Sequence, residues 1–190
     1  MRVVAGKYRS RQLATFPGAA LRPTSDRLRE TLFDVLAAQG SLAGTRWLDL
    51  FAGTGAVGIE ALSRGAKEIY FVEAARGPVA LIRKNLKSLE ISRGAEVIAA
   101  KAIHALHRLS GQGLRFDFCF VDPPYDMEDQ YALVLDELSG SSLLAPSATV
   151  IAEHSKHFDL AGQFGDLHRY RRLQQGDAVL SFYQSTAAVT

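Results

Sequence analysis

The sequence predicts a doubly wound α/β fold, in which a mostly parallel sheet of seven strands ends in an antiparallel C-terminal hairpin. Three observations lead to this prediction. Strand-like apolar runs alternate with helical patterns after residue 44, a glycine-rich turn follows the first of these runs, and two extended segments near the C-terminus flank the tight turn 175–177. Strands that alternate with helices pair in parallel, whereas a short turn joins antiparallel strands. With 190 residues, the chain is long enough to bury the core of one domain.

An N-terminal extension, residues 1–40, precedes the alternating part of this single domain, residues 1–190. The segments MRVVAG and RQLAT flank a short turn, which predicts a small β-hairpin. Apolar residues recur with helical spacing over about 25–38, and Thr24 or Ser25 can cap the helix that this spacing predicts. We therefore expect a hairpin and a helix ahead of the sheet.

From residue 44 onward, strands and helices are expected to follow one another along the chain. Buried strands are expected at 46–51, 68–73, 95–100, 116–122 and 148–154, and the two strands of the terminal hairpin at 167–174 and 178–184. Helices are expected at 56–64, from about 78 to 89 and at 130–138. Ligands of such folds lie at the carboxyl ends of the parallel strands. The segments that follow the first, second and fourth strands are therefore the candidates for ligand binding.

The charge of the chain is unevenly distributed. The first 25 residues contain five basic side chains and no acidic one, whereas the whole chain carries a net charge of only +2. Lys7, Arg9 and Arg11 alternate and could share one face. Together with Arg22 they would form an arm that follows the phosphates of a nucleic acid. The alternative is a solvated run of charge without a partner.

The composition disfavours several other ligands and partners. No apolar stretch approaches the roughly 18 residues of a membrane-spanning helix. The basic N-terminus lacks the apolar core of a signal peptide, so we expect a cytoplasmic protein without a membrane partner. The five histidines and the single cysteine show no metal-ligand spacing, so no metal is expected.

A glycine-rich loop after the first strand indicates a ligand that contains a nucleoside. Residues 53–58 (GTGAVG) match the pattern G-x-G-x-x-G, and Glu73 lies twenty residues beyond Gly53, where its carboxylate can accept hydrogen bonds from both hydroxyls of a ribose. This arrangement fits NAD as well as S-adenosylmethionine. Asp49 favours S-adenosylmethionine, because a carboxylate suits an ammonium and a sulfonium better than a pyrophosphate. The alternative role of Asp49 is to bond the amides of the turn itself.

The tetrapeptide Asp122-Pro123-Pro124-Tyr125 ends the fourth expected strand. Two consecutive prolines form a stiff turn without backbone donors, so their carbonyls and the Asp122 carboxylate would form a fixed set of acceptors. A planar NH₂ group needs such acceptors, because attack on a sulfonium methyl requires its nitrogen to become more tetrahedral. Tyr125 offers a face on which an extruded base can stack. The tetrapeptide therefore favours methyl transfer to an amino group over a tight surface turn with an aromatic lid.

Together, these motifs resemble a known family. DLFAGTG followed by DPPY is similar to the amino-group type of class I methyltransferases, whose fold is Rossmann-like. MRVVAGKYRSRQL, LRPTSDRLRETLFDVL, WLDLFAGTGAVGIEALSRGA, FVE and FDFCFVDPPY are similar, in order and spacing, to the RsmD family of bacterial 16S ribosomal RNA guanine-N2 methyltransferases. The resemblance spans nearly the whole chain. It implies that the cofactor is S-adenosylmethionine and that the partner is 16S rRNA within a small-subunit particle, and we expect the protein to act as a monomer.

The resemblance also implies roles for individual residues. The residues that would line the cofactor are Asp49, Ala52, Gly53, Gly55, Glu73 and Asp122. The residues that would grip the guanine are Asp122, Pro123, Pro124 and Tyr125. After the third strand, methyltransferases of this type often place an acid that binds the adenine amino group. Lys101 and Ala102 occupy that place here, so we expect the backbone at Ala102 to hold the adenine.

Other activities fit parts of the sequence. Adenine-N6 or cytosine-N4 methylation and methylation of a protein glutamine use a similar Pro-Pro-aromatic motif, although the small basic arm and the lack of a target-recognition domain disfavour a sequence-specific DNA enzyme. An NAD-dependent oxidoreductase is disfavoured by the Asp-Pro-Pro-Tyr turn and by the lack of a second catalytic domain. A non-enzymatic RNA-binding module is a third alternative. Glu153 and His154, which end the fifth strand, could lie at the rim of the site or in solvent.

Overall fold

The computed structural model describes residues 1–16, 24–124 and 127–186. Among these residues, eight strands form one sheet with the order β3-β2-β1-β4-β5-β8-β7-β6. The strands are β1 (Arg46–Leu50), β2 (Glu68–Glu73), β3 (Ala95–Ala99), β4 (Phe116–Val121), β5 (Leu144–Ser155), β6 (Gln163–Phe164), β7 (Leu167–Gln175) and β8 (Ala178–Ser185). The first five pair in parallel, and the last three continue the sheet in the antiparallel sense.

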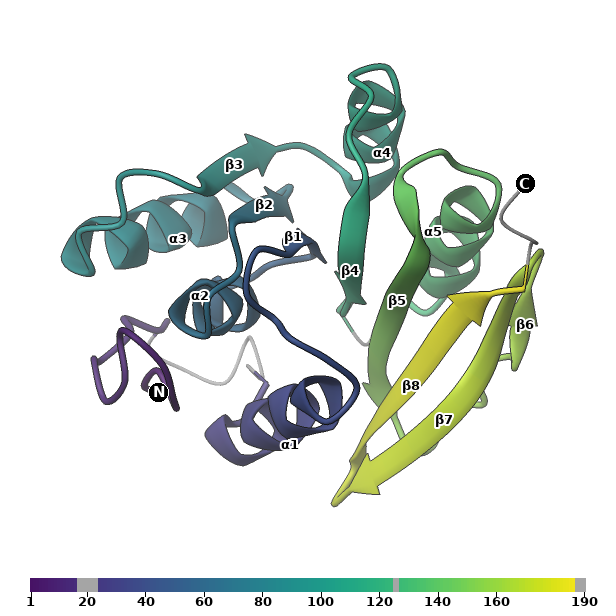
Figure 1. The fold of residues 1–190 in the computed structure, drawn as a ribbon, viewed down its shortest axis with the longest axis horizontal. Coiled ribbons are helices and arrows are strands. Elements are labelled where there is room, and N and C mark those ends of the chain that lie inside the picture. Colours follow the sequence, from purple (N-terminus) through teal and green to yellow (C-terminus); the bar gives the residue numbers. More distant parts are fainter. Residues whose placement is uncertain (17–23, 125–126, 187–190) are drawn as a thin grey trace.

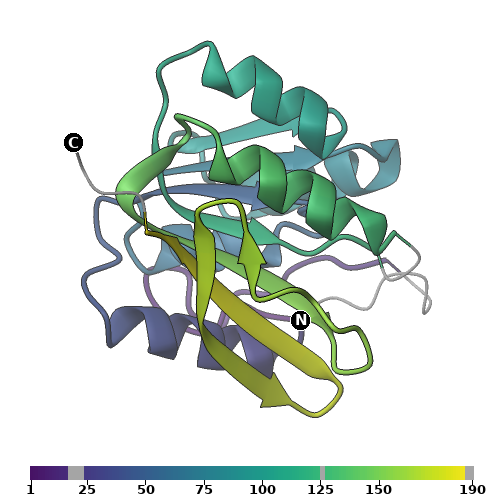
Figure 2. The same cartoon turned by 90° about the vertical axis from the view of Figure 1, so that its right-hand side faces the viewer.

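Helices cover both faces of this sheet (Figures 1 and 2). One face carries α1 (Asp26–Ala37), α2 (Ala56–Ser63) and α3 (Arg76–Ser88), and the other carries α4 (Ala102–Ser110) and α5 (Asp129–Ser139). None of these helices in the described part of the chain is long and apolar enough to cross a bilayer. The core is therefore divided into two layers, one on each side of the sheet.

Neighbouring residues of one strand contribute to different layers. Trp47 packs in the cluster beneath α1 and α2, whereas Leu48 packs in the cluster beneath α4 and α5. Successive side chains of a strand point to opposite faces, and both faces are covered here. The central strands are for this reason continuous apolar runs, as parallel sheets require.

The strand order reverses beside β1, and this reversal determines where a ligand can bind. The chain runs from β1 outward through β2 to β3 and then returns to place β4 on the other side of β1. The connections after β1 and β4 consequently leave in opposite directions, which opens a crevice between them at their carboxyl ends. The glycine-rich loop and the Asp-Pro-Pro turn both lie at this edge.

From residue 24 onward, the fold agrees with the sequence-based prediction apart from two elements. All seven expected strands and all four expected helices are present, and the mixed, mostly parallel sheet is confirmed. The sheet has eight strands rather than seven because the two residues of β6 pair with the start of β7. Helix α4 was also not expected, although its buried residues Ala102, Ala105, Leu106 and Leu109 have helical spacing.

The N-terminal segment folds back on itself without forming regular strands. Its two arms meet at a single antiparallel bridge between Arg2 and Gln12, supported by backbone hydrogen bonds from Val3 to Arg11 and from Ser10 to Val3. The expected hairpin is thus reduced to one bridge. Of the two candidate caps of α1, the residue that caps it is Ser25, whose hydroxyl accepts from the Leu28 amide at 3.1 Å.

Candidate active site

A cavity of about 680 Å³ opens at the carboxyl ends of β1, β2 and β4, where the strand order reverses. This volume is in the range of small-molecule sites. The cavity brings together Asp49, Glu73 and Asp122, which come from three different strands. The other site residues expected from the sequence that line it are Ala52, Gly53, Ala102, Pro123 and Pro124. Two further ones, Arg22 and Tyr125, lie outside the described residues.

The glycine-rich loop turns sharply before α2. Gly53 and Gly55 have positive φ angles of 55° and 77°, which glycine adopts without steric cost, and Phe51 also has a positive φ angle, of 61°, which is uncommon for a residue with a Cβ atom. Gly55 does not line the cavity itself but ends the loop as the N-cap of α2. Gly58 serves packing, because a Cβ atom there would lie 2.3 Å from the ring of Phe71. The loop can therefore bring its amides close to a ligand while α2 packs tightly on the sheet.

Asp49 is buried in β1, with 2% of its surface exposed. Its Oδ2 accepts a hydrogen bond at 3.0 Å from the amide of Gly58, which lies in the first turn of α2 just beyond the glycine turn. Asp49 also lines the cavity, and the two roles coexist. Burial raises the pKa of Asp49 from 3.8 to about 8, although the Gly58 amide opposes this rise. A positive charge in the cavity would stabilise the ionised carboxylate.

Glu73 is held in place by the backbone. Its Oε2 accepts from the Gly53 amide at 3.1 Å and its Oε1 accepts from the Ala75 amide at 2.8 Å. A carboxylate can accept about four hydrogen bonds, so both oxygens keep capacity for a ligand in the cavity that Glu73 lines. The side chain is thus oriented before a ligand binds.

The Asp-Pro-Pro turn leaves the end of β4 toward the cavity. Pro123 is buried and Pro124 is exposed. The carbonyl of Pro124 accepts from the Met127 amide at 2.8 Å, so this carbonyl stabilises the turn itself, contrary to the expectation that both proline carbonyls face a substrate. Burial raises the pKa of Asp122 well above its ordinary value, and the neighbouring carboxylates of Glu153 and Asp49 raise it further.

Glu153 joins three elements next to the Asp-Pro-Pro turn. Because Val121 pairs with Ala152, the residues that follow them, Asp122 and Glu153, lie at neighbouring strand ends. The buried Glu153 side chain accepts from the Thr24 hydroxyl at 2.7 Å, and its backbone carbonyl accepts from the Tyr131 hydroxyl. The alternative prediction, that Glu153 lies in solvent at the end of β5, is therefore wrong.

Thr24 was missed as a site residue. It lines the cavity and bonds Glu153, although its position before α1 suggested only a helix cap. No local pattern links it to a strand 129 residues away. His154 is also buried, and its ring nitrogen Nε2 lies 3.0 Å from the Ser181 hydroxyl.

The charge of the cavity favours a cation. Asp49, Asp122 and Glu73 line it, and Lys101 is the one basic side chain among its described lining residues. S-adenosylmethionine carries an ammonium and a sulfonium, so its charge matches this lining, whereas the pyrophosphate of NAD would be repelled. Ala100, Lys101 and Ala102 form another wall of the cavity, at the start of α4. Within the described ranges, no three His, Cys, Asp or Glu side chains are placed to share a metal ion.

The three basic residues of the N-terminal segment have different neighbours. The Lys7 ammonium lies 5.1 Å from the centre of the Tyr8 ring, and the Arg11 guanidinium donates to the Ser88 carbonyl of α3 at 2.7 Å. Arg9 lines a second cavity beside α1. All three side chains are exposed, and each has different surroundings.

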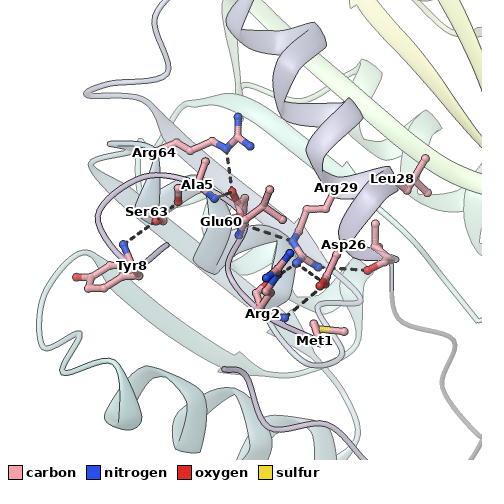
Figure 3. A network of polar contacts seen from close by, with 12 residues as sticks. Met1, Arg2, Ala5, Tyr8, Asp26, Leu28, Arg29, Glu60, Ser63 and Arg64 are labelled. Carbon is pink, nitrogen blue, oxygen red and sulfur yellow. Dashed lines mark hydrogen bonds and ion pairs between the residues drawn. The ribbon is translucent and has the colours of Figure 1, made fainter. Parts of the chain in front are cut away.

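Buried polar side chains fix this segment to the core (Figure 3). The Glu60 carboxylate of α2 accepts from the amides of Val4 and Ala5 at 2.8 and 2.9 Å. Asn85 of α3 exchanges two hydrogen bonds with the backbone of Ala14 and donates a third to the Thr54 carbonyl in the glycine-rich loop. The segment and the loop thus share one support.

Comparison with known proteins identifies the family. The model described as "Conserved hypothetical protein 95" matches residues 1–184. "Putative rRNA methyltransferase YlbH" of Bacillus subtilis is 34% identical over 97% of this chain and 98% of its own length. "Ribosomal RNA small subunit methyltransferase D" of Escherichia coli is 32% identical over 98% of this chain and 91% of its own length. The chain belongs to this RsmD-like methyltransferase family.

A solved structure agrees with this identification. It is that of a hypothetical protein from Thermus thermophilus, which is 33% identical and has a TM-score of 0.83 over 97% of this chain and 99% of its own. The resemblance seen in the sequence and the Rossmann-like methyltransferase fold are therefore confirmed. In this methyltransferase, the acidic cavity matches the positive charge of S-adenosylmethionine, and the Asp-Pro-Pro turn lies at the same cavity.

Proposed function

We propose that this methyltransferase transfers the methyl group of S-adenosylmethionine to the exocyclic N2 amine of a guanine in 16S ribosomal RNA. The observation that carries the proposal is the meeting of Asp49, Glu73 and the Asp122-Pro123-Pro124 turn in one cavity. The first two suit the methyl donor, and the third suits an amino group that accepts the methyl. The named relatives support ribosomal RNA as the substrate class.

We assign each part of the cofactor to residues of the cavity. Glu73 would accept from the ribose hydroxyls, Asp49 would lie near the methionine end, and the backbone at Ala102 would hold the adenine. Ala52 and Gly53 would line the path between them, with Gly55 shaping the loop. When bound, S-adenosylmethionine supplies an electrophilic methyl group attached to a sulfonium.

The Asp-Pro-Pro turn would act on the amine. Asp122 would accept a hydrogen bond from one N–H of the guanine amino group and turn its nitrogen lone pair toward the methyl carbon. Pro123 would keep the turn stiff and free of competing donors, and Pro124, which is exposed at the cavity, would contact the base. We assign Tyr125 the stacking role, because a flipped base needs an aromatic face.

RNA binding is assigned to the basic N-terminal segment. Lys7, Arg9 and Arg11 belong to it, with Arg22 at its end, and 16S rRNA in a small-subunit particle would supply the phosphates. The protein would act as a monomer in the cytoplasm, with no metal. The substrate strand must reach the cavity with one base extruded. The basic segment would provide affinity for the RNA backbone, and the Asp-Pro-Pro turn would act on the extruded base.

The decisive experiment is methylation of small-subunit particles and of naked 16S rRNA from a strain that lacks the gene. The protein, labelled S-adenosylmethionine and each RNA are incubated together, and the labelled nucleoside is identified by digestion and mass spectrometry. We expect N2-methylguanosine at one position. N6-methyladenosine or N4-methylcytidine would overturn the guanine assignment, and label in ribosomal protein would overturn RNA as the substrate.

A further inference from the structure

A second cavity, of about 310 Å³, lies between the N-terminal segment and α1, and we call it the arginine notch. Arg2 and Arg9 line it from the segment, and Arg27 lines it from the helix. Asp26 and Glu30 lie in the same lining. The notch is therefore lined by three arginines from two separate segments, and the charges around them decide what can bind.

The notch has an excess of positive charge. The Asp26 carboxylate is paired with the buried guanidinium of Arg29 at 2.9 Å, which compensates its charge. Among the described residues, Arg2, Arg9 and Arg27 form no ion pair. Glu30 is thus the acid that remains to oppose three exposed arginines. The positive charge of the notch is therefore only partly balanced, which favours the binding of an anion.

The backbone that carries the notch is anchored before any ligand binds. Arg29, which is fully buried, donates to the Arg2 carbonyl and pairs with Glu60 at 3.6 Å (Figure 3). Ser63 accepts from the Tyr8 amide at 2.9 Å on the other side of the turn. Because these bonds fix the segment against α1 and α2, binding an anion does not have to order the segment first.

The notch lies close to the active-site cavity. Thr24 lines the active-site cavity, and Asp26 and Arg27 line the notch. Three residues of chain span at most about 11 Å, so the start of α1 is the partition between the two cavities. A nucleic-acid strand that delivers a base to one cavity would pass a neighbouring phosphate near the other.

We propose that the arginine notch binds a backbone phosphate of the substrate RNA, within about two nucleotides of the base that is methylated. The proposal rests on the proposed RNA methyltransferase function and adds Arg2 and Arg27 to the substrate contacts. The guanidinium group is planar and donates in pairs to phosphate oxygens, and it stays charged at every physiological pH. Arg9 contacts RNA here, while Arg11 is bonded to α3.

The first test measures the salt dependence of RNA binding by the full-length protein. Arg9→Gln and Arg27→Gln are compared with Arg93→Gln, which removes the same charge from an exposed residue beyond α3. The probe is a 16S rRNA fragment that contains the mapped methylation site. Each notch variant should bind it about tenfold more weakly and reduce the log–log salt slope by about 0.7–0.9, with unchanged cofactor affinity. Glu30→Gln should strengthen binding several-fold at low salt.

The second test locates the phosphate. Single phosphates within two nucleotides of the target are replaced by uncharged methylphosphonates. One replacement should weaken binding by wild type and have little further effect on Arg27→Gln. If every replacement costs both proteins equally, or if the notch variants behave like Arg93→Gln while methylation proceeds, the notch proposal is overturned. Methylation of another base with the notch effects intact would instead overturn the guanine assignment and leave the notch in place.

Discussion

The active-site cavity and the arginine notch lie on the two sides of the start of α1, yet their charges behave differently. The cavity contains the carboxyl groups of the buried Asp49 and the half-buried Asp122, whose pKa values are both raised, so its charge depends on pH and on the ligand. The notch is lined by exposed arginines that form no ion pair among the described residues. The first arrangement suits a small cation that is bound and released, and the second suits a polyanion. Five predictions test this division.

The largest effect is expected from Asp122→Ala. The acceptor it removes matters most when the amine becomes tetrahedral, so single-turnover methylation at saturating cofactor should slow on the order of 10²-fold. RNA affinity and its salt slope should stay as in wild type, because the notch is untouched. Asp129→Ala removes an exposed carboxylate from the first turn of α5 and is the matched control. Full activity of Asp122→Ala would contradict the catalytic role.

The second-largest effect is expected from Glu73→Ala, which should weaken cofactor binding. The loss of hydrogen bonds to a charged group corresponds to about 1.5–3 kcal/mol in calorimetry with S-adenosylmethionine. Glu68→Ala, at the other end of β2 and paired with Arg46, should leave this affinity unchanged. Equal losses in both variants would indicate damage to β2 rather than a lost ribose contact. Tight binding of NAD would contradict the assignment of the cofactor.

Substitutions of Tyr125 distinguish the contribution of stacking from that of hydrogen bonding. Tyr125→Ala should cost about 1–3 kcal/mol of transition-state stabilisation, the scale of base–aromatic contacts, and Tyr125→Phe should restore most of the activity. The expected contrast with Asp122 arises because the ring needs only its face, whereas the carboxylate must accept a hydrogen bond. The comparison is read from single-turnover rates, and a Phe variant as slow as the Ala variant would assign the role to the hydroxyl.

The smallest effect is a pH dependence of cofactor binding. Asp49 must ionise to pair with the cofactor, and its pKa in the free protein is about 8. The cofactor's own ammonium loses its proton over the same range, so wild type is compared with Asp49→Asn, which shares that loss. The ratio of the two affinities for S-adenosylmethionine should rise about tenfold between pH 7 and 9. The salt slope of RNA binding should not change over the same range. A constant ratio would show that Asp49 is already ionised.

The raised pKa of Asp49 also predicts how the stability of the protein depends on pH. The folded protein keeps a proton on Asp49 that the unfolded chain releases above about 3.8. The free energy of unfolding should consequently fall as the pH rises from about 4 toward 8, and saturation with the cofactor should offset this fall. Thermal unfolding with and without cofactor measures both effects.

The sequence predicted the parallel sheet and the edge at which the cavity opens because both depend on local patterns. A strand buried on both faces is a continuous apolar run, and the residues after β1, β2 and β4 must meet when the order of the strands reverses. Asp49, Glu73 and Asp122 could be chosen on this ground alone. Helix α4 has a helical apolar spacing as well and could have been found.

Long-range polar contacts could not be predicted in the same way. Arg29 and Glu60 have the spacing of charged residues on helix surfaces, but α1 and α2 bury both completely under the N-terminal segment. Thr24 reaches Glu153 only because the chain folds across the end of β5. The neighbours of Lys7, Arg9 and Arg11 likewise depend on the geometry of a turn. The alternation of these residues in the sequence does not reveal that geometry. Such contacts follow from the fold and have no pattern of their own.

The side chain of Asn85 has a consequence for how the protein unfolds. It is fully buried and bonds the backbone of residue 14 and that of residue 54 at the same time. If the N-terminal segment detached, Asn85 and the Arg29–Glu60 pair would lose partners inside the core, which is costly for buried polar groups. Detachment alone is therefore an unfavourable intermediate. We expect the segment and the Rossmann-like core to melt in one cooperative transition, with protection from hydrogen exchange at Ala14 as long-lived as in the central strands.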